Sequence, residues 1–453
     1  MKDPGVVVLI ACYELGHQPL AVAWPAAFLE QRGYAPDVID VSVEPLDVAK
    51  VARARFVAIS VPMHTALRLG VGVAERVRAV NPRCHICFYG LYAALNADWL
   101  LAGCADSVLA GELESQLVDV IERVGRGEPT RGAPPAVDKL AFPVPSRRAL
   151  PPLEKYARLE REGRLEVTGY VEASRGCKHR CRHCPIPPVY GGRFVVVPRD
   201  VVLADVRQLV AAGARHITFG DPDFLNGPGH ALAVARALHA EFPTLTFDVT
   251  TKVEHLLRQR RQLADLAALG CAFVVSAVES LSDTVLRHLD KGHTRADVHE
   301  ALALARAAGL VLRPTWVAFT PWTTLDDYRE MLAFIAGERL VDHVDPVQYS
   351  IRLLVPPGSL LLGSPALRPH LGDLVQDAFY YRWTHPDPRM DGLHVEVTAA
   401  VAEAAERKED ASLTFARVVA LADAAASAQT RSALPPYDPD RPRPPRLTEP
   451  WFC

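Results

Sequence analysis

The sequence lacks several features that would place the protein in a membrane or outside the cell. It contains no run of about 18 apolar residues, so no membrane-spanning helix is expected. Its nine cysteines are an odd number spread over 453 residues, which excludes a secreted disulfide framework. The short apolar run near the N-terminus is bounded by Asp3, Pro4 and Glu14, which favours a buried strand over a signal peptide. We therefore expect a cytoplasmic protein without a membrane partner.

A strong charge imbalance is also absent. The formal net charge is -3 at pH 7, which gives no reason to expect nucleic-acid binding. The composition, 49% hydrophobic and 23% charged, is typical of a soluble folded protein. A chain of 453 residues is too long for one ordinary core, so it predicts two domains with appendages.

Residues 1–124 alternate short apolar runs with helical patterns. This alternation predicts a doubly wound parallel sheet of Rossmann-like type. The expected strands are residues 6–12, 35–41, 56–62, 84–90 and 106–114, and the expected helices are 20–33, 66–82, 95–104 and 115–124. Residues 125–165 begin with a stretch rich in Pro, Gly and charge, which predicts a linker between domains.

A second βα series occupies residues 166–370. Its regularity predicts a partial (β/α)6 barrel, with active residues at the C-terminal ends of the strands. The expected strands are 169–174, 214–220, 245–251, 271–280, 310–319 and 345–354. Residues 371–453 are expected to form a C-terminal extension, with a helical segment over 398–429 and then a Pro-rich, extended tail.

Three cysteines lie close together directly after the first barrel strand. Cys177, Cys181 and Cys184 follow the spacing Cys-x3-Cys-x2-Cys. Zinc sites usually close to four ligands, and no fourth cysteine follows nearby, although His179 or His183 can supply one. A [4Fe–4S] cluster on three cysteines keeps one iron open, and an open iron can chelate S-adenosylmethionine (SAM). The position at the catalytic end favours the cluster.

This motif and its position resemble the radical SAM superfamily over residues 169–360. The resemblance implies an enzyme that cleaves SAM reductively and uses the radical to modify a small-molecule substrate. It also implies SAM contacts at Gly220 and Asp221, where the superfamily has a Gly-Gly-Glu-like segment and this chain has Gly-Asp-Pro. Glu279 and Ser280 resemble the Glu-Ser pair of cobalamin-type members.

Charged residues mark other barrel strands. Lys252 and Glu254 follow the third strand, where they can meet the SAM ribose or carboxylate, or be a solvated strand end. Arg313 lies within the fifth strand, so it needs a partner, either a substrate carboxylate or a structural ion pair. Lys178, Arg180 and Arg182 flank the cysteines, either as a solvated loop or as a docking face for an acidic electron donor of flavodoxin or ferredoxin type.

The order of the domains resembles radical SAM enzymes with an N-terminal cobalamin-binding (B12-binding) domain. The segment Gly111–Glu114 is similar to the "GEGE"-like segment of that family. The cobalt-ligating Asp-x-His-x-x-Gly motif is absent, and His17 and His64 follow strands without that neighbourhood. Cobalamin therefore either binds without that histidine, or the domain has kept the fold and lost the cofactor, which we favour.

We expect the remaining cysteines to fall into two groups, five in the cores of the domains and one at the end of the chain. Cys84 and Cys87 lie on one buried strand and point to opposite faces, so they are expected to be core thiols, as are Cys12, Cys104 and Cys271. The chain ends "LTEPWFC", which resembles radical SAM proteins named for a Cys-Cys-Ala-Glu-Pro or Cys-selenocysteine-Ala-Glu-Pro tail, although Ala-Glu-Pro is not present.

The terminal cysteine suggests two further hypotheses. One is that the natural chain continues past Cys453 through a UGA codon read as a stop. The other is that Cys453 reaches the active site and holds a substrate or a soft element such as arsenic. The alternative is a frayed terminus.

The sequence leaves the specific reaction open. Breaking one C–S bond of SAM gives 5′-deoxyadenosine and supports hydrogen abstraction or cobalamin-dependent radical methylation. Breaking a different C–S bond of SAM releases the 3-amino-3-carboxypropyl group, which can be transferred to a soft acceptor such as arsenic. The alternative from another class is a zinc-stabilised module that binds a metabolite.

Overall fold

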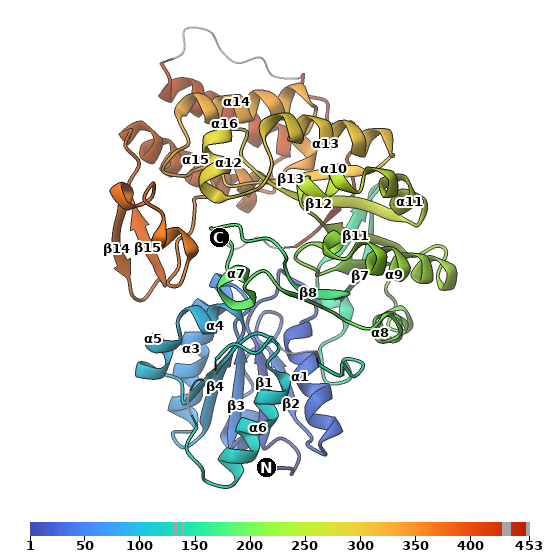
Figure 1. Cartoon of the computed structure of the whole chain (residues 1–453), viewed down its shortest axis with the longest axis vertical. Coiled ribbons are helices and arrows are strands. Elements are labelled where there is room, and N and C mark those ends of the chain that lie inside the picture. Colours follow the sequence, from blue (N-terminus) through green and yellow to red (C-terminus); the bar gives the residue numbers. More distant parts are fainter. Residues whose placement is uncertain (131, 133, 138–139, 428–435, 450–453) are drawn as a thin grey trace.

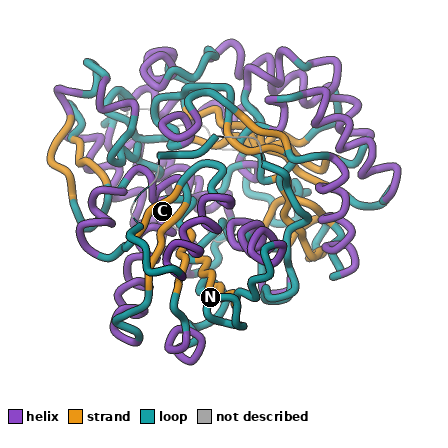
Figure 2. The backbone as a smooth tube through the Cα atoms, turned by 60° about the horizontal axis from the view of Figure 1, so that its bottom comes forward, coloured by secondary structure: helices purple, strands orange, loops and turns teal. Residues whose placement is uncertain are grey.

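The computed structural model describes residues 1–130, 132, 134–137, 140–427 and 436–449. It contains a lower N-terminal domain, an upper barrel domain and C-terminal helices packed beside the barrel (Figure 1). In both domains the helices lie on the outside of the strands (Figure 2). None of the helices in the described part of the chain is both long and apolar enough to cross a membrane.

The N-terminal domain is a five-stranded parallel sheet in the order β2-β1-β3-β4-β5. The strand sequences are almost entirely apolar because helices cover both faces of the sheet. The strands are β1 (Val7–Ala11), β2 (Asp37–Asp40), β3 (Phe56–Ser60), β4 (His85–Tyr89) and β5 (Ser107–Leu109). The helices are α1 (Leu20–Gln31), α2 (Val48–Arg53), α3 (His64–Val80), α4 (Leu91–Leu95), α5 (Ala97–Gly103) and α6 (Glu114–Gly125). The strand order reverses direction between β1 and β3, which opens a crevice at their C-terminal ends.

The second domain is a curled half-barrel with the strand order β13-β12-β11-β10-β7-β6-β16. Its parallel strands are β7 (Arg164–Val171), β10 (His216–Phe219), β11 (Thr246–Thr250), β12 (Cys271–Glu279) and β13 (Val311–Trp316). An edge hairpin adds β6 (Arg158–Arg161), and β16 (Arg446–Leu447) pairs antiparallel with β6. The short strands β8 (Ser174–Gly176) and β9 (Phe194–Val196) pair with each other on either side of the cysteine loop.

Helices cover the outer face of the half-barrel. They are α8 (Arg199–Ala211), α9 (Pro228–Glu241), α10 (Val253–Arg258), α11 (Leu263–Ala268), α12 (Asp283–Leu289), α13 (Arg295–Ala307) and α14 (Leu325–Gly337). The short helix α7 (Ile186–Tyr190) instead follows the cysteine loop and packs against α4 of the N-terminal domain. Thr294 and Thr324 begin α13 and α14 with complete capping boxes, which satisfy backbone N–H groups at the helix starts. The fold class expected from the sequence, a parallel α/β domain followed by a partial barrel, is confirmed.

Two details of the predicted elements are wrong. The sixth barrel strand, expected over 345–354, is instead a 3-10 helix over Pro346–Ser350, followed by a single β-bridge between Phe319 and Arg352. The side chain of Gln348 accepts a hydrogen bond from the Trp316 backbone N–H at 2.9 Å. The Gln348 side chain thereby satisfies a backbone N–H on the free edge of β13. A neighbouring strand would otherwise accept that hydrogen bond.

The helical segment expected over 398–429 is two helices, α15 (Pro388–Glu406) and α16 (Ala411–Ala425). Asp410 begins α16 by accepting a hydrogen bond from the Ser412 backbone N–H at 2.8 Å. A hairpin of β14 (Leu371–Val375) and β15 (Tyr380–Trp383) precedes them and was not predicted.

The connection between the domains is held by a buried arginine. The Nε of Arg147 is 2.6 Å from Asp205 of α8 in the barrel domain. Its Nη1 donates to Gln18 of the N-terminal domain at 2.7 Å. One guanidinium therefore fixes this part of the connection against both domains, because its donors point in several fixed directions.

Candidate active site

The three clustered cysteines lie in the loop between β8 and α7, at the C-terminal end of the barrel. Gly176, which precedes them, has φ of +75°. A Cβ at this position would lie 2.5 Å from the Tyr190 ring and 2.6 Å from the Arg193 carbonyl oxygen. Glycine is thus required where the chain turns from β8 into the loop.

The loop presents three thiols in a common, largely buried environment. Cys177 and Cys181 are buried and Cys184 is partly buried. Burial, helped by the charges of Cys181 and Cys177, raises the pKa of the Cys184 thiol to about 12. Three buried thiolates so close together need positive charge to be stable, and an iron–sulfur cluster supplies it.

The spacing of these thiols does not suit a single zinc ion. Two thiolates on one tetrahedral zinc lie about 3.8 Å apart, given Zn–S bonds near 2.3 Å. Among the described residues, the one group of three His, Cys, Asp or Glu side chains with all ligand atoms within 4.8 Å is His179, Asp223 and His255. The three thiols do not form such a compact group among the described residues.

A buried ion pair stands beside the loop. Lys291 donates to Glu279 Oε1 at 3.1 Å, and His183 Nε2 lies 3.3 Å from the same oxygen. Burial alone would raise the pKa of Glu279, but the Lys291 ammonium and His183 reverse this and hold it well below its usual value. Conversely, although burial lowers the pKa of Lys291, Glu279 and the charges of Cys181 and Cys184 raise it overall. Lys291 therefore contributes positive charge next to the thiols.

The structure places Gly220 and Asp221 directly after β10. A Cβ on Gly220 would lie 2.2 Å from the Tyr170 hydroxyl, so only glycine fits against this ring. Both oxygens of Asp221 are occupied, by the Ala173 backbone N–H at 2.8 Å and by the Ser174 hydroxyl at 2.5 Å. Burial raises the pKa of Asp221 to about 7. Asp221 therefore positions the segment that enters the cysteine loop.

The other predicted strand-end residues have protein partners. Lys252 is buried and its Nζ lies 3.6 Å from Glu254, which also pairs with Arg258 at 2.7 Å. The hydroxyl oxygen of Ser280 accepts a hydrogen bond from the Ser282 backbone N–H. Arg313 pairs with Asp345 at 3.1 Å, so the structural ion pair left open by the sequence is present.

Two adjacent cavities lie around these residues. The first, of about 240 Å³, is bounded by both domains, through Trp24 and Tyr89 on one side and Arg175 on the other. The second, of about 250 Å³, lies inside the half-barrel, with Arg313 in its wall. Both cavities are lined by Tyr170, Gly220 and Pro222. The C-terminal edge of the N-terminal sheet and the barrel interior therefore meet at Gly220.

The two domains match separate protein families. Residues 171–335 match the model of the radical SAM superfamily, and residues 6–121 match that of the B12 binding domain. The chain therefore carries a radical SAM domain and a B12 binding domain. It is therefore an enzyme, and the superfamily implies a [4Fe–4S] cluster and SAM.

Solved structures share the two-domain radical SAM fold. TsrM from Kitasatospora setae, a radical SAM methyltransferase with tryptophan and a SAM analogue bound, is 16% identical with a TM-score of 0.68, covering 94% of this chain and 96% of that one. OxsB, a cobalamin-dependent radical SAM enzyme with aqua-cobalamin bound, is 14% identical with a TM-score of 0.67, covering 88% and 67%. At these identities the likeness concerns the fold.

Curated relatives include a ribosomal-protein methylthiotransferase and a tRNA methylthio-adenosine synthase. The ribosomal protein uS12 methylthiotransferase RimO of Desulfosudis oleivorans is 29% identical over 196 residues, covering 40% of this chain and 43% of that protein. A tRNA-2-methylthio-N(6)-dimethylallyladenosine synthase of Chlorobium phaeobacteroides is 25% identical over 214 residues, covering 44% and 46%. This chain therefore spans about half the length of the curated relatives it matches.

The radical SAM barrel and the N-terminal domain are joined by one largely buried arginine, Arg175, and the glutamates around it. Arg175 Nη1 lies 2.6 Å from Glu114 and 3.3 Å from Glu112, and its Nε pairs with Glu172 at 2.9 Å. Tyr190 donates to the second oxygen of Glu112 at 2.9 Å. Burial raises the pKa of Glu112 to about 7, while Arg175 opposes that rise. The "GELE" segment, Gly111–Glu114, thus contacts the segments on both sides of the cysteine loop.

The histidines of the N-terminal domain do not line the interdomain cavity. His64 Nε2 lies 2.7 Å from the Ala378 carbonyl oxygen. His17 lies in the wall of the barrel cavity, where it stacks on Tyr170 with ring centroids 4.5 Å apart. Trp24 and Tyr89 contribute to the wall of the interdomain cavity, and none of its lining residues offers an imidazole to cobalt.

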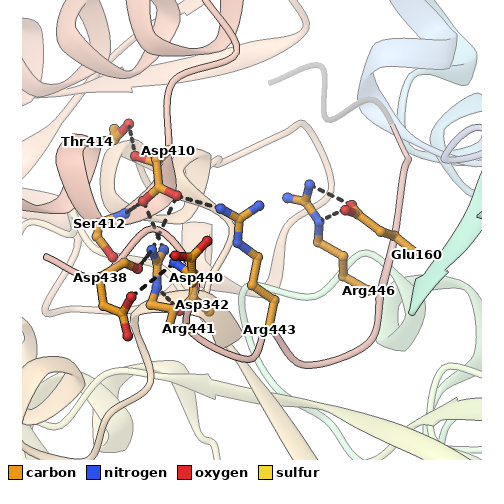
Figure 3. Close-up of polar contacts among 10 residues, drawn as sticks. All are labelled: Glu160, Asp342, Asp410, Ser412, Thr414, Asp438, Asp440, Arg441, Arg443 and Arg446. Atoms are coloured by element: carbon orange, nitrogen blue, oxygen red, sulfur yellow. Dashed lines mark hydrogen bonds and ion pairs between the residues drawn. The ribbon is translucent and has the colours of Figure 1, made fainter. Parts of the chain in front are cut away.

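The C-terminal arm, residues 436–449, forms part of the wall of the barrel cavity. Arg441 pairs with Asp342 at 2.7 Å and with Asp410 at 2.8 Å, and Arg443 and Arg446 form further ion pairs (Figure 3). Leu447 and Glu449 line the cavity, and Glu449 lies 3.5 Å from His17. Cys453, predicted as a tail ligand, lies outside the described residues.

The sequence did not predict several residues that the structure brings to the site. Lys291 and His293 belong to the "DKGHTR" loop after α12, which lies beside the cysteine loop. Asp223 and His255 lie close to His179. The available signal for the first two was a lysine and a histidine on either side of a glycine, in the short loop between two helices. Cys84 and Cys87 are buried in the N-terminal core, as are Cys12 and, in the barrel, Cys271, whereas Cys104 is partly exposed.

Proposed function

We propose that this radical SAM enzyme modifies a small-molecule substrate bound in the barrel cavity. The observation that carries the proposal is that this cavity and the interdomain cavity share Tyr170, Gly220 and Pro222. A group held at the edge of the N-terminal sheet would therefore face a substrate inside the barrel. Open α/β sheets bind ligands at this edge, which supports the same arrangement.

In this proposal Cys177, Cys181 and Cys184 hold a [4Fe–4S] cluster, which supplies the electron that cleaves a C–S bond of SAM. Lys291 balances the negative charge of the thiolates, and Glu279 keeps that ammonium in place. Lys252, Glu254 and Glu279 remain our candidates for SAM contacts at the strand ends. Asp221 and Arg313 have internal partners and are assigned to positioning.

Cobalamin-dependent radical methylation is the second candidate. The match of residues 6–121 to the B12 binding domain and the aromatic cavity wall favour it. Trp24 and Tyr89 would pack against the macrocycle, and the buried Glu112–Arg175 pair would hold the cofactor domain against the barrel. The third candidate, transfer of the 3-amino-3-carboxypropyl group to a soft acceptor, depends on Cys453 and the arm.

Product analysis distinguishes these candidates. The reconstituted enzyme is incubated anaerobically with SAM and dithionite, with and without cobalamin, and the nucleosides are identified. 5′-Deoxyadenosine alone supports hydrogen abstraction, and its appearance together with cobalamin-dependent S-adenosylhomocysteine supports methylation. Methylthioadenosine identifies the third candidate. Formation of none of these products contradicts the proposed function.

We further propose that the arm keeps the barrel cavity closed and carries Cys453 toward it. Arg441→Ala removes a guanidinium shared by two carboxylates and should accelerate tryptic cleavage of the bond between Arg446 and Leu447, with cluster content unchanged. Arg389→Ala, which removes an exposed pair with Asp387, is the control. Cys453→Ser should abolish transfer to a soft acceptor and leave SAM cleavage intact. Equal proteolysis of Arg441→Ala and wild type would contradict the closed arm.

A further inference from the structure

A second group of metal-ligand side chains lies next to the cysteine loop. His179 comes from the loop itself, Asp223 follows β10, and His255 lies in α10 after β11. His255 Nδ1 is 2.7 Å from Asp223 Oδ2, and His179 Nε2 is 3.6 Å from the same oxygen. The three atoms all lie within 4.8 Å of one another.

These three atoms are buried and lack hydrogen bonds. His179 Nε2, Asp223 Oδ2 and His255 Nδ1 each have less than 1 Å² of exposed surface and no hydrogen-bond partner among the described residues. Asp223 is 0% exposed and His255 is 6% exposed. Their contacts with one another are two histidine–carboxylate pairs on a single oxygen, which are charged only when the imidazoles are protonated. A metal ion between the three atoms would satisfy all of them with neutral imidazoles.

The surrounding groups orient these side chains. The second oxygen of Asp223 accepts a hydrogen bond from the Thr251 hydroxyl at 2.7 Å, which leaves Oδ2 free to face the two imidazoles. The other ring nitrogen of His179, Nδ1, lies 3.5 Å from Glu254 Oε2. A carboxylate behind a histidine is the usual arrangement that fixes the ring and tautomer of a metal ligand.

We propose that His179, Asp223 and His255 bind one divalent transition-metal ion of the zinc or ferrous type, separate from the cluster on the cysteines. Two imidazoles and one carboxylate are the ligands these ions prefer. None of the three residues lines either cavity described above, so the ion has a structural role. It ties the middle of the cysteine loop to the ends of β10 and β11. This inference does not depend on the proposed reaction.

Metal binding to the reconstituted full-length enzyme tests this site. After the cluster is assembled, the protein is titrated anaerobically with Co²⁺ or Zn²⁺, desalted and analysed for metals and sulfide. We expect one tightly bound equivalent beyond the cluster, without loss of iron or sulfide. His255→Ala and Asp223→Asn should lose that equivalent, and His299→Ala, at an exposed position, should keep it. Glu254→Gln should weaken the affinity roughly 10- to 100-fold.

Two further measurements keep the test decisive if a variant folds poorly. In the Cys177→Ser/Cys181→Ser/Cys184→Ser chain, bound Co²⁺ should keep its visible ligand-field absorption, because the proposed ligands are intact. X-ray absorption of Zn²⁺ in the wild-type holoenzyme should show only nitrogen and oxygen ligands near 2.0–2.2 Å. Sulfur ligands to that zinc, or equal metal retention by wild type and His255→Ala, would overturn the proposal. Absence of the additional equivalent would identify a metal-free His–Asp–His contact instead.

Discussion

Two sheet edges meet in this enzyme, and they present different chemistry. The barrel edge carries thiols and buried cations, represented by Cys177, Cys181 and Lys291. The N-terminal edge carries aromatic rings and carboxylates, among them Glu14 and Glu112. Arg175 crosses from the barrel side and balances the carboxylates. Under the proposed function, the barrel edge carries the redox chemistry, and the N-terminal edge contributes a charge-matched contact to it.

The strongest test of this difference compares one thiol from each domain. Cys181→Ala removes a cluster ligand, so SAM cleavage should fall below detection and the brown absorbance should be lost. Cys87→Ala, in the core of the N-terminal domain, removes a buried thiol of similar size and should keep both. Nucleoside analysis and iron content measure the outcome. Cleavage by Cys181→Ala would show that the barrel thiols are not the redox centre.

The next largest effect is expected at the ion pair beside the loop. Lys291→Met leaves Glu279 buried without its cation, which should destabilise the protein by about 3–5 kcal/mol in urea unfolding. The Lys291→Met/Glu279→Gln double variant should recover most of the loss, because it leaves no unpaired charge. The exposed Lys155→Met, in the connection between the domains, is the control. A double variant no more stable than Lys291→Met would disprove the pairing.

Glu112 predicts a pH effect on the N-terminal side. Burial raises its pKa from 4.5 to about 7, so the folded state holds a proton that the unfolded state releases between these values. Its contribution to stability is therefore complete below about pH 4.5 and decreases as the pH rises to about 7, by up to about 3 kcal/mol. Glu112→Gln should show a smaller decrease than wild type in unfolding experiments at pH 5 and 8.

The exposed Glu128→Gln is the control, since its carboxylate is on the surface. Other buried carboxyls with raised pKa values, such as Asp221, titrate equally in both proteins, so the difference between them isolates Glu112. Identical pH profiles for wild type and Glu112→Gln would mean that the carboxylate stays charged against Arg175 throughout.

The sequence predicted those parts of the site that depend on the spacing of residues close together in the chain. Cys177, Cys181 and Cys184 lie within eight residues after a recognisable strand, so spacing and position were sufficient. Lys291 meets Glu279 across 12 residues, and Arg175 meets Glu112 across 63. Such contacts depend on how the elements pack, and no local pattern encodes them.

The false sixth strand has a similar cause. Residues 345–354 alternate in a way that is typical of a strand, but Gln348 satisfies the Trp316 N–H with its side chain. The resemblance implied a SAM contact at Asp221, and the structure adds partners that the motif does not encode, the Ser174 hydroxyl and the Ala173 backbone N–H. Hydrophobic pattern predicts which elements form, whereas the partners of polar side chains emerge only in the packed structure.

The smallest expected effect concerns electron delivery to the barrel edge. Lys178 and Arg180 are exposed beside the buried thiols, so they can guide an acidic donor without touching SAM. Lys178→Glu/Arg180→Glu should slow flavodoxin-supported SAM cleavage roughly tenfold at low salt, with a smaller loss at high salt. Cleavage with dithionite should be unchanged. Arg76→Glu/Arg83→Glu makes the same charge change on the exposed surface of the N-terminal domain and should not slow the reaction. Equal loss in both variants would mean that the donor responds to net charge rather than to the cysteine loop.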